Sequence, residues 1–256
     1  MRKLFLALIS TIFAACSFVP RLTPDPSERM VFKPSPTATL VPSPTPTPVP
    51  PTVSPVPTID PNYVRDDFSN TLDAHWSWKR ENPENWSLTA IPGSLQINVT
   101  GGFVATHTNS NLLLRPAPQG NFQIETQMTF RPTHDFVFAG LIIYQDDLNF
   151  VQAGRGYCHS SGCIGEGFYM YAYDKGRVLK PDFGQLYREI DPVLLRLSRI
   201  ENIYTFEVST DGKVWFMIGS HTSEMNPLQI GLVAGQRMRG EIQSAAFDYF
   251  EVRSLP

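Results

Sequence analysis

The sequence predicts an all-β sandwich of two packed antiparallel sheets in the part of the chain that follows residue 61. Short runs in which apolar and polar residues alternate recur from Val64 onward, and turn residues separate them. No amphipathic helical pattern interrupts these runs, and aromatic residues, which strands favour, make up 12% of the chain. About a dozen such runs in about 190 residues match the strand number of a two-sheet fold.

The first fifteen residues form a predicted signal peptide. Arg2 and Lys3 precede an uncharged apolar run, residues 4–14, which is too short to span a bilayer. The run ends in Phe13-Ala14-Ala15-Cys16, which resembles a bacterial lipobox, although Phe13 stands where that motif prefers leucine. The resemblance implies that Cys16 is lipidated and becomes the new N-terminus. The alternative is an ordinary cleaved signal peptide with an incidental cysteine.

A proline-rich linker follows the cysteine and holds most of the chain's 23 prolines. Proline fixes φ and removes a donor, so we expect a disordered, extended polyproline II stalk rather than helix or sheet. The predicted organisation is a signal peptide at 1–15, a lipid-anchored Pro/Ser/Thr-rich linker at 16–61 and one β-sandwich domain at 62–256. We therefore expect an exported protein, lipid-anchored at the cell envelope, with its domain facing the exterior.

Charge and hydropathy argue against nucleic acid as a partner and limit the expected contact with the membrane. The formal net charge is -3, and no run of lysine or arginine occurs after the first residues, so we expect no nucleic-acid binding. Apart from the signal peptide, no segment approaches transmembrane length, so the lipid anchor is the one expected membrane contact.

The predicted strands follow from alternation and turn signals. Phe122 to Phe130 alternates strictly except at Thr126, and the Asp211-Gly212 pair predicts a hairpin between two further runs. The other predicted strands are Trp86–Ile91 and Leu95–Val99 around a Pro92-Gly93 turn, Gly140–Gln145, Phe150–Arg155, Phe168–Tyr173, Leu194–Arg199, Tyr204–Ser209, Val214–Ile218, Ile230–Ala234 and Phe247–Val252. The predicted core comprises Ile124, Met128, Leu141, Ile143, Leu195, Leu197, Phe206, Val208, Ile230 and Phe250.

Several short motifs occur in the order expected of one known family. They are Asp66-Asp67-Phe68, Trp76 and Trp78, Pro92-Gly93-Ser94-Leu95, Leu112-Leu113-Leu114-Arg115, Ala139 to Asp147, Leu195-Arg196-Leu197, Ser209-Thr210-Asp211-Gly212 and Phe247-Asp248-Tyr249-Phe250. Together they resemble the concanavalin A-like domain at the C-terminus of family 43 β-xylosidases, and its stand-alone bacterial relatives. The resemblance implies a jelly-roll sandwich. In the xylosidases this domain packs on a catalytic propeller, for which this chain shows no sequence, so the fold does not fix the function.

A glycosidase of this fold would need two carboxylates facing one another across a groove. Same-face residues of a strand stand two apart, and the neighbours of Glu125 at that spacing are Gln123 and Gln127. Asp146 and Asp147 are adjacent, so they face opposite ways. We therefore expect a domain that is not an enzyme, with an unrecognised glycoside hydrolase as an alternative.

Cys158 and Cys163 flank a short loop that also contains His159. Two cysteines and a histidine are zinc ligands, but a structural zinc site needs four ligands and no second cluster occurs. In an oxidising compartment a disulfide is favoured, and one cysteine for the lipid plus two for the bridge accounts for all three. We expect the Cys158–Cys163 disulfide.

A strand with three alternating tyrosines is the candidate ligand site. Tyr169, Tyr171 and Tyr173 share one face, and their rings suit the apolar faces of pyranose sugars. We predict that they share a concave sheet with polar residues that orient sugar hydroxyls. Those residues are Arg196, Glu207, Glu125, Gln127 and Gln152. The alternatives are tyrosines that point into the core, and a solvated sheet face without a ligand.

Two further groups have structural interpretations. Trp76, Trp78 and Trp86 are expected to pack in the core or at its edge rather than to contact ligand. Asp67 and Asp248 lie on the first and last strands, which tend to be neighbours in jelly rolls, and they would suit a structural calcium ion. No other cofactor is expected.

The leading hypothesis from these observations is a non-catalytic module, displayed on a lipoprotein stalk, that binds a glycan or polysaccharide. The rival is a structural or protein-docking module without a sugar site. An aromatic-lined concave groove would favour the first hypothesis, and an exposed flat apolar patch would favour the second.

Overall fold

A computed structural model describes residues 63–160, 163–237 and 240–256 of the chain. The predicted signal peptide, the lipidated Cys16 and the proline-rich linker lie outside these residues. Among the described residues, no helix is long and apolar enough to cross a membrane.

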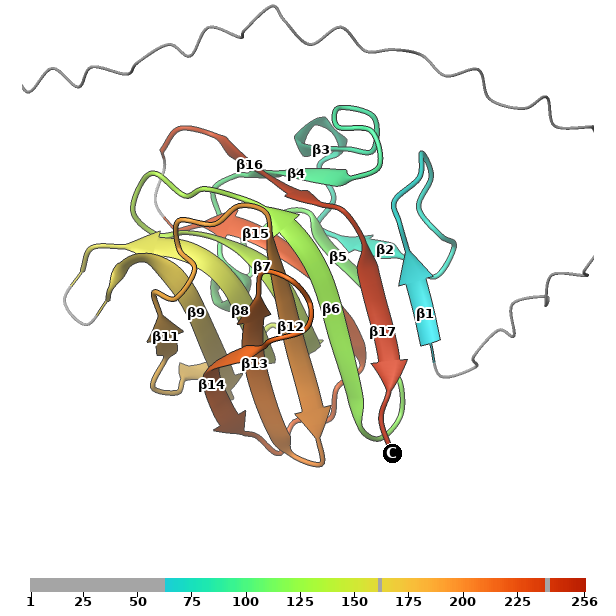
Figure 1. Ribbon diagram of the computed structural model, residues 1–256, viewed down its shortest axis with the longest axis vertical. Coiled ribbons are helices and arrows are strands. Elements are labelled where there is room, and N and C mark those ends of the chain that lie inside the picture. The colour runs from blue at the N-terminus through green and yellow to red at the C-terminus, as the bar shows by residue number, and fades with distance from the viewer. Residues whose placement is uncertain (1–62, 161–162, 238–239) are drawn as a thin grey trace, which may run out of the picture. The chain divides into compact units, whose positions relative to one another are not determined.

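The described residues form two antiparallel sheets packed face to face, which confirms the predicted sandwich (Figure 1). The nine-stranded sheet contains β1 (Tyr63–Asp66), β3 (Trp86–Ser87), β4 (Leu95–Val99), β6 (Phe122–Thr129), β12 (Val193–Ile200), β13 (Ile203–Ser209), β14 (Phe216–Thr222), β16 (Gln243–Phe247) and β17 (Phe250–Ser254). The eight-stranded sheet contains β2 (Ser77–Lys79), β5 (Leu112–Pro116), β7 (Val137–Asp146), β8 (Asn149–Cys158), β9 (Gly165–Asp174), β10 (Arg177–Val178), β11 (Asp182–Gly184) and β15 (Gln229–Gln236).

Strand order places distant segments side by side. The nine-stranded sheet runs β14-β13-β12-β6-β16-β4-β3, with β17 also paired to β6 and β1 paired to β17. The eight-stranded sheet runs β10-β9-β8-β7-β15-β5-β2, with β11 paired to β9. The only helices in the described part are two short 3-10 turns, η1 (Pro83–Asn85) and η2 (Val104–Thr106). The first and last strands are neighbours, as predicted.

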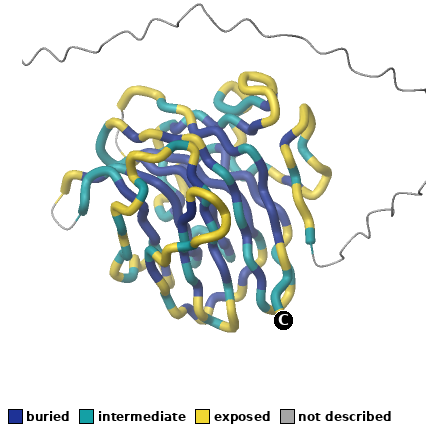
Figure 2. Tube along the Cα trace, in the orientation of Figure 1, coloured by how far each residue is buried: buried dark blue, intermediate teal, exposed yellow. Residues whose placement is uncertain are grey.

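The core lies between the two sheets and follows the alternation of the sequence. In β6 every second residue from Phe122 to Met128 is buried, and the residues between them are partly exposed. All ten predicted core residues are buried members of this core. Thr126, the one polar residue in the apolar row, is satisfied because its hydroxyl donates to the Tyr249 carbonyl at 2.5 Å. Figure 2 shows the buried strand centres and the exposed loops around them.

Most observed strands contain the predicted run and extend beyond it by a few residues, but two predicted strands differ more. The strand predicted over Trp86–Ile91 ends at Ser87, because the Ser87 hydroxyl accepts from the amides of Thr89 and Ala90 and turns the chain. Two strands, β16 and β17, replace the single strand predicted over Phe247–Val252.

The Asp-Gly hairpin is present, but its loop is longer than two residues. Gly212 has φ of 69°, and Asp211 accepts from the amides of Lys213 and Val214. Strand β14 therefore begins at Phe216 rather than at the predicted Val214.

The tryptophans pack as predicted. Trp76 is a buried core member whose indole N–H donates to Asp66 at 2.7 Å. Trp78 and Trp86 pack against the same core, and their rings lie 4.9 Å apart.

Candidate functional site

The three tyrosines of β9 lie on the outer face of the eight-stranded sheet. Their neighbours in the strand, Phe168 and Met170, point into the core between the sheets. Tyr169 and Tyr173 belong to a second apolar cluster, against which Tyr171 packs, and the Tyr169 and Tyr171 rings stack in parallel with centroids 6.0 Å apart. The predicted strand parity is therefore correct, and the alternative of core-facing tyrosines is wrong.

A cavity of about 510 Å³ opens on this outer face, within the usual range for small-ligand sites. Tyr169, Tyr171 and Tyr173 line it, together with Phe103, Phe136 and Phe138 and with atoms of Gln152. The phenylalanines were not predicted as site residues. No local signal in the sequence marks the cavity: a Cβ at Gly154 or Gly156 would meet backbone of the neighbouring strand β7, so these glycines allow close strand contact and do not leave empty space.

Gln152 lies in the register row of Tyr171, on the adjacent strand β8. Its side chain is 1% exposed, yet its amide oxygen Oε1 has no hydrogen-bond partner among the described residues. Buried polar groups are nearly always paired, and each exception requires an explanation. Gln152 Oε1 is therefore a buried acceptor beside the cavity for which the described residues supply no donor.

The hydroxyls of Tyr169, Tyr171 and Tyr173 differ in their hydrogen bonds and in their burial. The Tyr169 hydroxyl donates to the Gly165 carbonyl at 2.5 Å and accepts from the amide of Ile164 at 3.4 Å. Burial raises the pKa of Tyr171 above its ordinary value and raises the pKa of Tyr173 to about 12. Both hydroxyls therefore stay protonated at neutral pH and can act as donors and acceptors.

A loop that we name the strap, residues 102–109, crosses the outer face beside the cavity. Its ends are tied to β15, since the Gly102 amide donates to the Gln236 carbonyl and the Asn109 side chain donates to the Ala234 carbonyl, both at 2.8 Å. The Phe103 ring in the strap meets the Tyr173 ring edge-on at 6.1 Å. The strap thus forms one wall of the cavity.

An ion cluster holds the far side of the strap. His107 Nδ1 lies 2.7 Å from Asp147, to which Arg80 and the Tyr144 hydroxyl also donate, at 3.0 and 2.8 Å. Burial raises the pKa of Asp147, but the hydrogen bonds from His107, Tyr144 and Arg80 outweigh it and hold that pKa below its ordinary value. Asp147 is therefore a carboxylate that fixes the strap and is not free for catalysis.

The predicted disulfide joins Cys158 and Cys163, which confirms that prediction over the zinc alternative. Both cysteines and Ser160 line the cavity on the side away from the strap. The bridge therefore gives the cavity a second fixed wall.

The four charged or polar partners predicted for the tyrosines lie on the other sheet, so that part of the predicted site is wrong. Arg196 is on β12, Glu207 on β13, and Glu125 and Gln127 on β6, all in the nine-stranded sheet. The chain leaves the eight-stranded sheet after β11 and enters the other sheet at β12, so residues close in sequence face opposite sides of the sandwich. Of the predicted polar residues, only Gln152 shares a sheet with the tyrosines.

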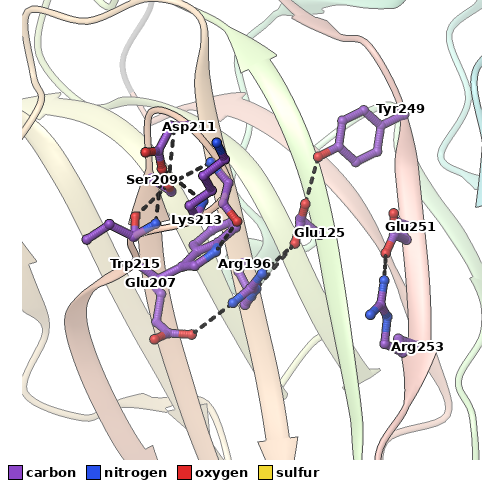
Figure 3. Close-up of polar contacts among 12 residues, drawn as sticks. Glu125, Arg196, Glu207, Ser209, Asp211, Lys213, Trp215, Tyr249, Glu251 and Arg253 are labelled. Carbon is purple, nitrogen blue, oxygen red and sulfur yellow. Dashed lines mark hydrogen bonds and ion pairs between the residues drawn. The ribbon is translucent and has the colours of Figure 1, made fainter.

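On the outer face of the nine-stranded sheet the charged residues satisfy one another (Figure 3). Strand pairing aligns Glu251, Glu125, Arg196 and Glu207 in one row across the sheet. Arg196 lies 3.0 Å from Glu125 and 3.9 Å from Glu207, and its guanidinium stacks 3.5 Å from the centre of the Trp215 ring. This arrangement is a cross-strand ion network.

The ion network continues to Tyr249 and Arg65, beside the paired strands β17 and β1. The Tyr249 hydroxyl donates to Glu125 at 2.8 Å, and the Arg65 guanidinium lies 3.7 Å above the Tyr249 ring. Burial, then the adjacent Glu125 carboxylate, raises the pKa of Tyr249 well above its usual range. Gln127 donates to Asp248 at 2.6 Å.

The two aspartates predicted for calcium have separate partners. Asp67 lies 2.7 Å from Arg65, and Asp248 accepts from Ser94 and from Gln127. No group of three or more His, Cys, Asp or Glu residues that suits a metal ion occurs among the described residues. These contacts do not bring Asp67 and Asp248 together as ligands.

The known proteins to which this chain is similar include the following three. It is 27% identical over 209 residues to the non-reducing end α-L-arabinofuranosidase BoGH43B of Bacteroides ovatus, covering 75% of this chain and 37% of that protein. The solved GH43 protein BlXynB of Bacillus licheniformis matches with a TM-score of 0.67 and 19% identity, over 77% of this chain and 40% of that one. A β-glucanase of Bacillus licheniformis matches with a TM-score of 0.54 and 12% identity, over 76% of this chain and 99% of that one. The last two show similarity of fold.

The chain spans about two fifths of the length of the Bacteroides ovatus arabinofuranosidase and of BlXynB. The family model for the β-xylosidase C-terminal concanavalin A-like domain matches residues 65–253 of the sequence. This range includes every described strand except the ends of β1 and β17. The motifs, the two-sheet fold and this match agree, and the chain belongs to the family of β-xylosidase C-terminal concanavalin A-like domains.

Proposed function

We propose that this domain is a non-catalytic carbohydrate-binding module and that its site is the cavity on the outer face of the eight-stranded sheet. The observation that carries the proposal is a cavity walled by aromatic rings, beside which the buried amide oxygen of Gln152 has no partner among the described residues. Sugars combine apolar ring faces, which stack on aromatic side chains, with hydroxyls that donate and accept hydrogen bonds. The cavity offers both kinds of contact in one place.

Each part of the cavity has a role in this proposal. The Tyr171 ring, half-buried between Tyr169 and Tyr173, supplies a stacking surface. Gln152 Oε1 accepts from a sugar hydroxyl, and the tyrosine hydroxyls complete the polar contacts. Arg237 lies exposed at the rim and is the one charged residue among those that line the cavity in the described part of the chain.

The composition of the cavity favours binding over hydrolysis. Glycosidases place two carboxyl groups beside the scissile bond. Among the described residues that line this cavity there is neither aspartate nor glutamate. On the other face, Glu125 and Glu207 are both paired to Arg196.

The names of the relatives suggest which glycans to test. The relatives include an α-L-arabinofuranosidase from Bacteroides ovatus and a xylan β-1,4-xylosidase from Bacillus halodurans. The name of a solved GH43B protein of Bacteroides ovatus also includes xyloglucan. We therefore propose xylan-type and xyloglucan-type chains as first candidates.

The experiment is a glycan-array screen of the full chain, followed by calorimetry with each glycan that binds. We expect Tyr171→Ala to lose binding, because it removes the central stacking ring. Tyr187→Ala is the matched control, since Tyr187 is a half-buried tyrosine that packs on Phe216 outside the cavity. The proposal fails if the wild-type chain binds no glycan, or if folded Tyr171→Ala binds as well as the control.

We also propose that the module is exported and held at the cell envelope by lipid on Cys16, with the proline-rich linker as spacer. The lipobox-like sequence before Cys16 supports this. Cys16→Ser should release the protein from the membrane fraction or leave an unprocessed precursor. Unchanged detergent partitioning of that variant would contradict the anchor.

A protein-docking role is the second candidate, and one observation favours it. Val214, Phe216 and Met217 are 54%, 38% and 67% exposed around the start of the edge strand β14. Consecutive exposed apolar residues are common in protein interfaces. Met217→Lys would weaken such docking and leave glycan binding unchanged, so the two roles are separable.

A further inference from the structure

Strands β11 and β14 lie next to each other at one edge of the sandwich, although they belong to different sheets (Figure 1). Strand β11 pairs with β9 and β14 pairs with β13, so no backbone ladder joins β11 to β14 in the described part of the chain. A side chain makes the link instead. Asp182 of β11 accepts a hydrogen bond from the backbone amide of Ser220 in β14, at 3.0 Å. The carboxylate therefore pairs a donor of the kind that a sheet edge leaves open.

Two glycines allow the two strands to come this close. A Cβ at Gly219 of β14 would overlap the Cβ of Asp182 and would stand 2.5 Å from its Oδ2. A Cβ at Gly184 of β11 would come 3.0 Å from Cδ1 of Ile218. A side chain at Gly219 would therefore push the carboxylate away from β14.

His221 lies beside the same carboxylate. Its Nε2 is 3.6 Å from Oδ2 of Asp182, the oxygen that accepts from Ser220. The side chain of His221 is 11% exposed, and Nε2 has no hydrogen-bond partner among the described residues. Buried polar groups are nearly always paired, so this nitrogen requires an explanation.

The other groups that face His221 do not change charge near neutral pH. Its partner in strand pairing is Tyr204 of β13, and burial raises the pKa of that hydroxyl above its ordinary value. On β9, the residues paired with β11 that point into the core are Phe168 and Met170, which are apolar. Among the described residues, Asp182 is the one ion-pair partner of His221.

We propose that Asp182, Ser220 and His221 form a pH-sensitive clasp that holds β14 against β11. Histidine ordinarily changes charge between about pH 5 and pH 8, whereas aspartate ordinarily stays ionised throughout that range. Protonation makes Nε2 of His221 a cationic donor that faces a carboxylate, so the contact strengthens at acidic pH. Loss of that proton leaves the Ser220 hydrogen bond as the one polar link in the clasp, and the clasp loosens.

The clasp controls the free edge of the nine-stranded sheet. When β14 separates from β11, the Ser220 amide becomes an open donor at an edge to which another strand can pair. The same strand begins with the exposed Phe216 and Met217. The clasp therefore links pH to the exposure of this edge, and it does so independently of the glycan cavity.

The test is hydrogen exchange of the Ser220 amide in the full chain, followed by NMR at about pH 5.5 and about pH 8 and corrected for the intrinsic exchange rate. We expect the wild-type protection factor to be about 2- to 5-fold higher at the acidic pH, as for a partly exposed ion pair. His221→Gln should remove this difference, because glutamine does not titrate. Asp182→Asn should remove it as well, since the charge that favours protonation of His221 is gone.

His75→Gln is the matched control, because His75 pairs with Asp73 at an exposed position outside the clasp. It should leave the pH dependence of the Ser220 amide unchanged. Equal wild-type protection factors at the two pH values would overturn the clasp. A pH dependence that persists in folded His221→Gln and in folded Asp182→Asn would also overturn it, because another group would then be its cause.

Discussion

The two outer faces of this sandwich are built from the same alternating strands but differ in what is left unpaired. On the nine-stranded sheet, Arg196 is shared by two carboxylates and a tryptophan ring, and Glu125 has both Arg196 and Tyr249 as partners. On the eight-stranded sheet, aromatic rings surround a cavity in which the Gln152 amide oxygen has no described partner. A self-satisfied charged face stabilises the fold, whereas a cavity with an unpaired polar group is suited to a ligand.

The largest expected effect concerns the core that both faces share. Phe206 of the nine-stranded sheet is fully buried, and its ring lies 6.5 Å from that of Phe168 in the other sheet. Phe206→Ala should lower the free energy of unfolding by about 3–5 kcal/mol in chemical denaturation. Ile203→Ala, on the same strand at a position that is 45% exposed, should change it by less than about 0.5 kcal/mol. Equal effects would mean that the sheets do not share one core.

The next effect separates structure from binding on the charged face. Glu125→Gln removes the carboxylate that accepts from both Arg196 and Tyr249, and it should cost about 1–3 kcal/mol of stability. Glu207→Gln should cost about 0–1 kcal/mol, because Glu207 is more exposed and lies 3.9 Å from Arg196. Neither change should alter glycan affinity. A loss of glycan affinity in either variant would place the ligand on the nine-stranded sheet and would contradict the proposed site.

Replacing one glutamine on each face by methionine should change the free energy of unfolding in opposite directions. Gln152→Met removes a buried amide whose oxygen has no partner among the described residues, so it should stabilise the fold by about 1 kcal/mol while weakening glycan binding. Gln127→Met removes the 2.6 Å hydrogen bond to Asp248 and should destabilise the fold by about 1 kcal/mol without affecting binding. Thermal unfolding and calorimetry give the two readouts. Destabilisation by Gln152→Met would show that its amide is already satisfied.

The smallest effect is a pH dependence of the tyrosine row. Burial raises the pKa of Tyr173 to about 12 and also raises that of Tyr171. A raised folded pKa contributes stability in full below the ordinary tyrosine value of about 10 and loses it as pH rises toward 12. Stability and glycan binding should therefore be insensitive to these tyrosines below pH 9. Tyr171→Phe should reduce the alkaline loss, and ionisation of Tyr171 near pH 9 in spectrophotometric titration would contradict its burial.

Alternation along the sequence predicted which side chains share a face of one strand, but not which strands share a sheet. It placed Phe206, Leu197 and Ile124 in the core and the three tyrosines of β9 together on one face, but it left open whether that face points outward or into the core. It could not place Arg196 relative to Tyr171, because that depends on where the chain crosses between sheets. Strand pairing is set by contacts distant in sequence, and local pattern carries little of that information.

The strap and the walls of the cavity were also beyond local pattern. Phe103 and Val104 lie outside any strand, and their burial depends on β15 and on the cluster around Asp147. The disulfide was predictable because the cysteine count and the expected oxidising compartment limit the choices. Motifs that follow from chemistry and local spacing were predicted, and features that need tertiary packing were not.

The most direct test of the central claim is a parallel calorimetric titration of Tyr171→Ala and Arg196→Ala with one glycan that the wild-type chain binds. Each variant first needs a thermal unfolding curve to confirm that it is folded. If glycan binds at the outer face of the eight-stranded sheet, Tyr171→Ala should lose measurable affinity. Arg196→Ala should keep the wild-type dissociation constant within about 2-fold. Loss of binding in Arg196→Ala, with binding retained in Tyr171→Ala, would contradict the account and move the site to the charged face.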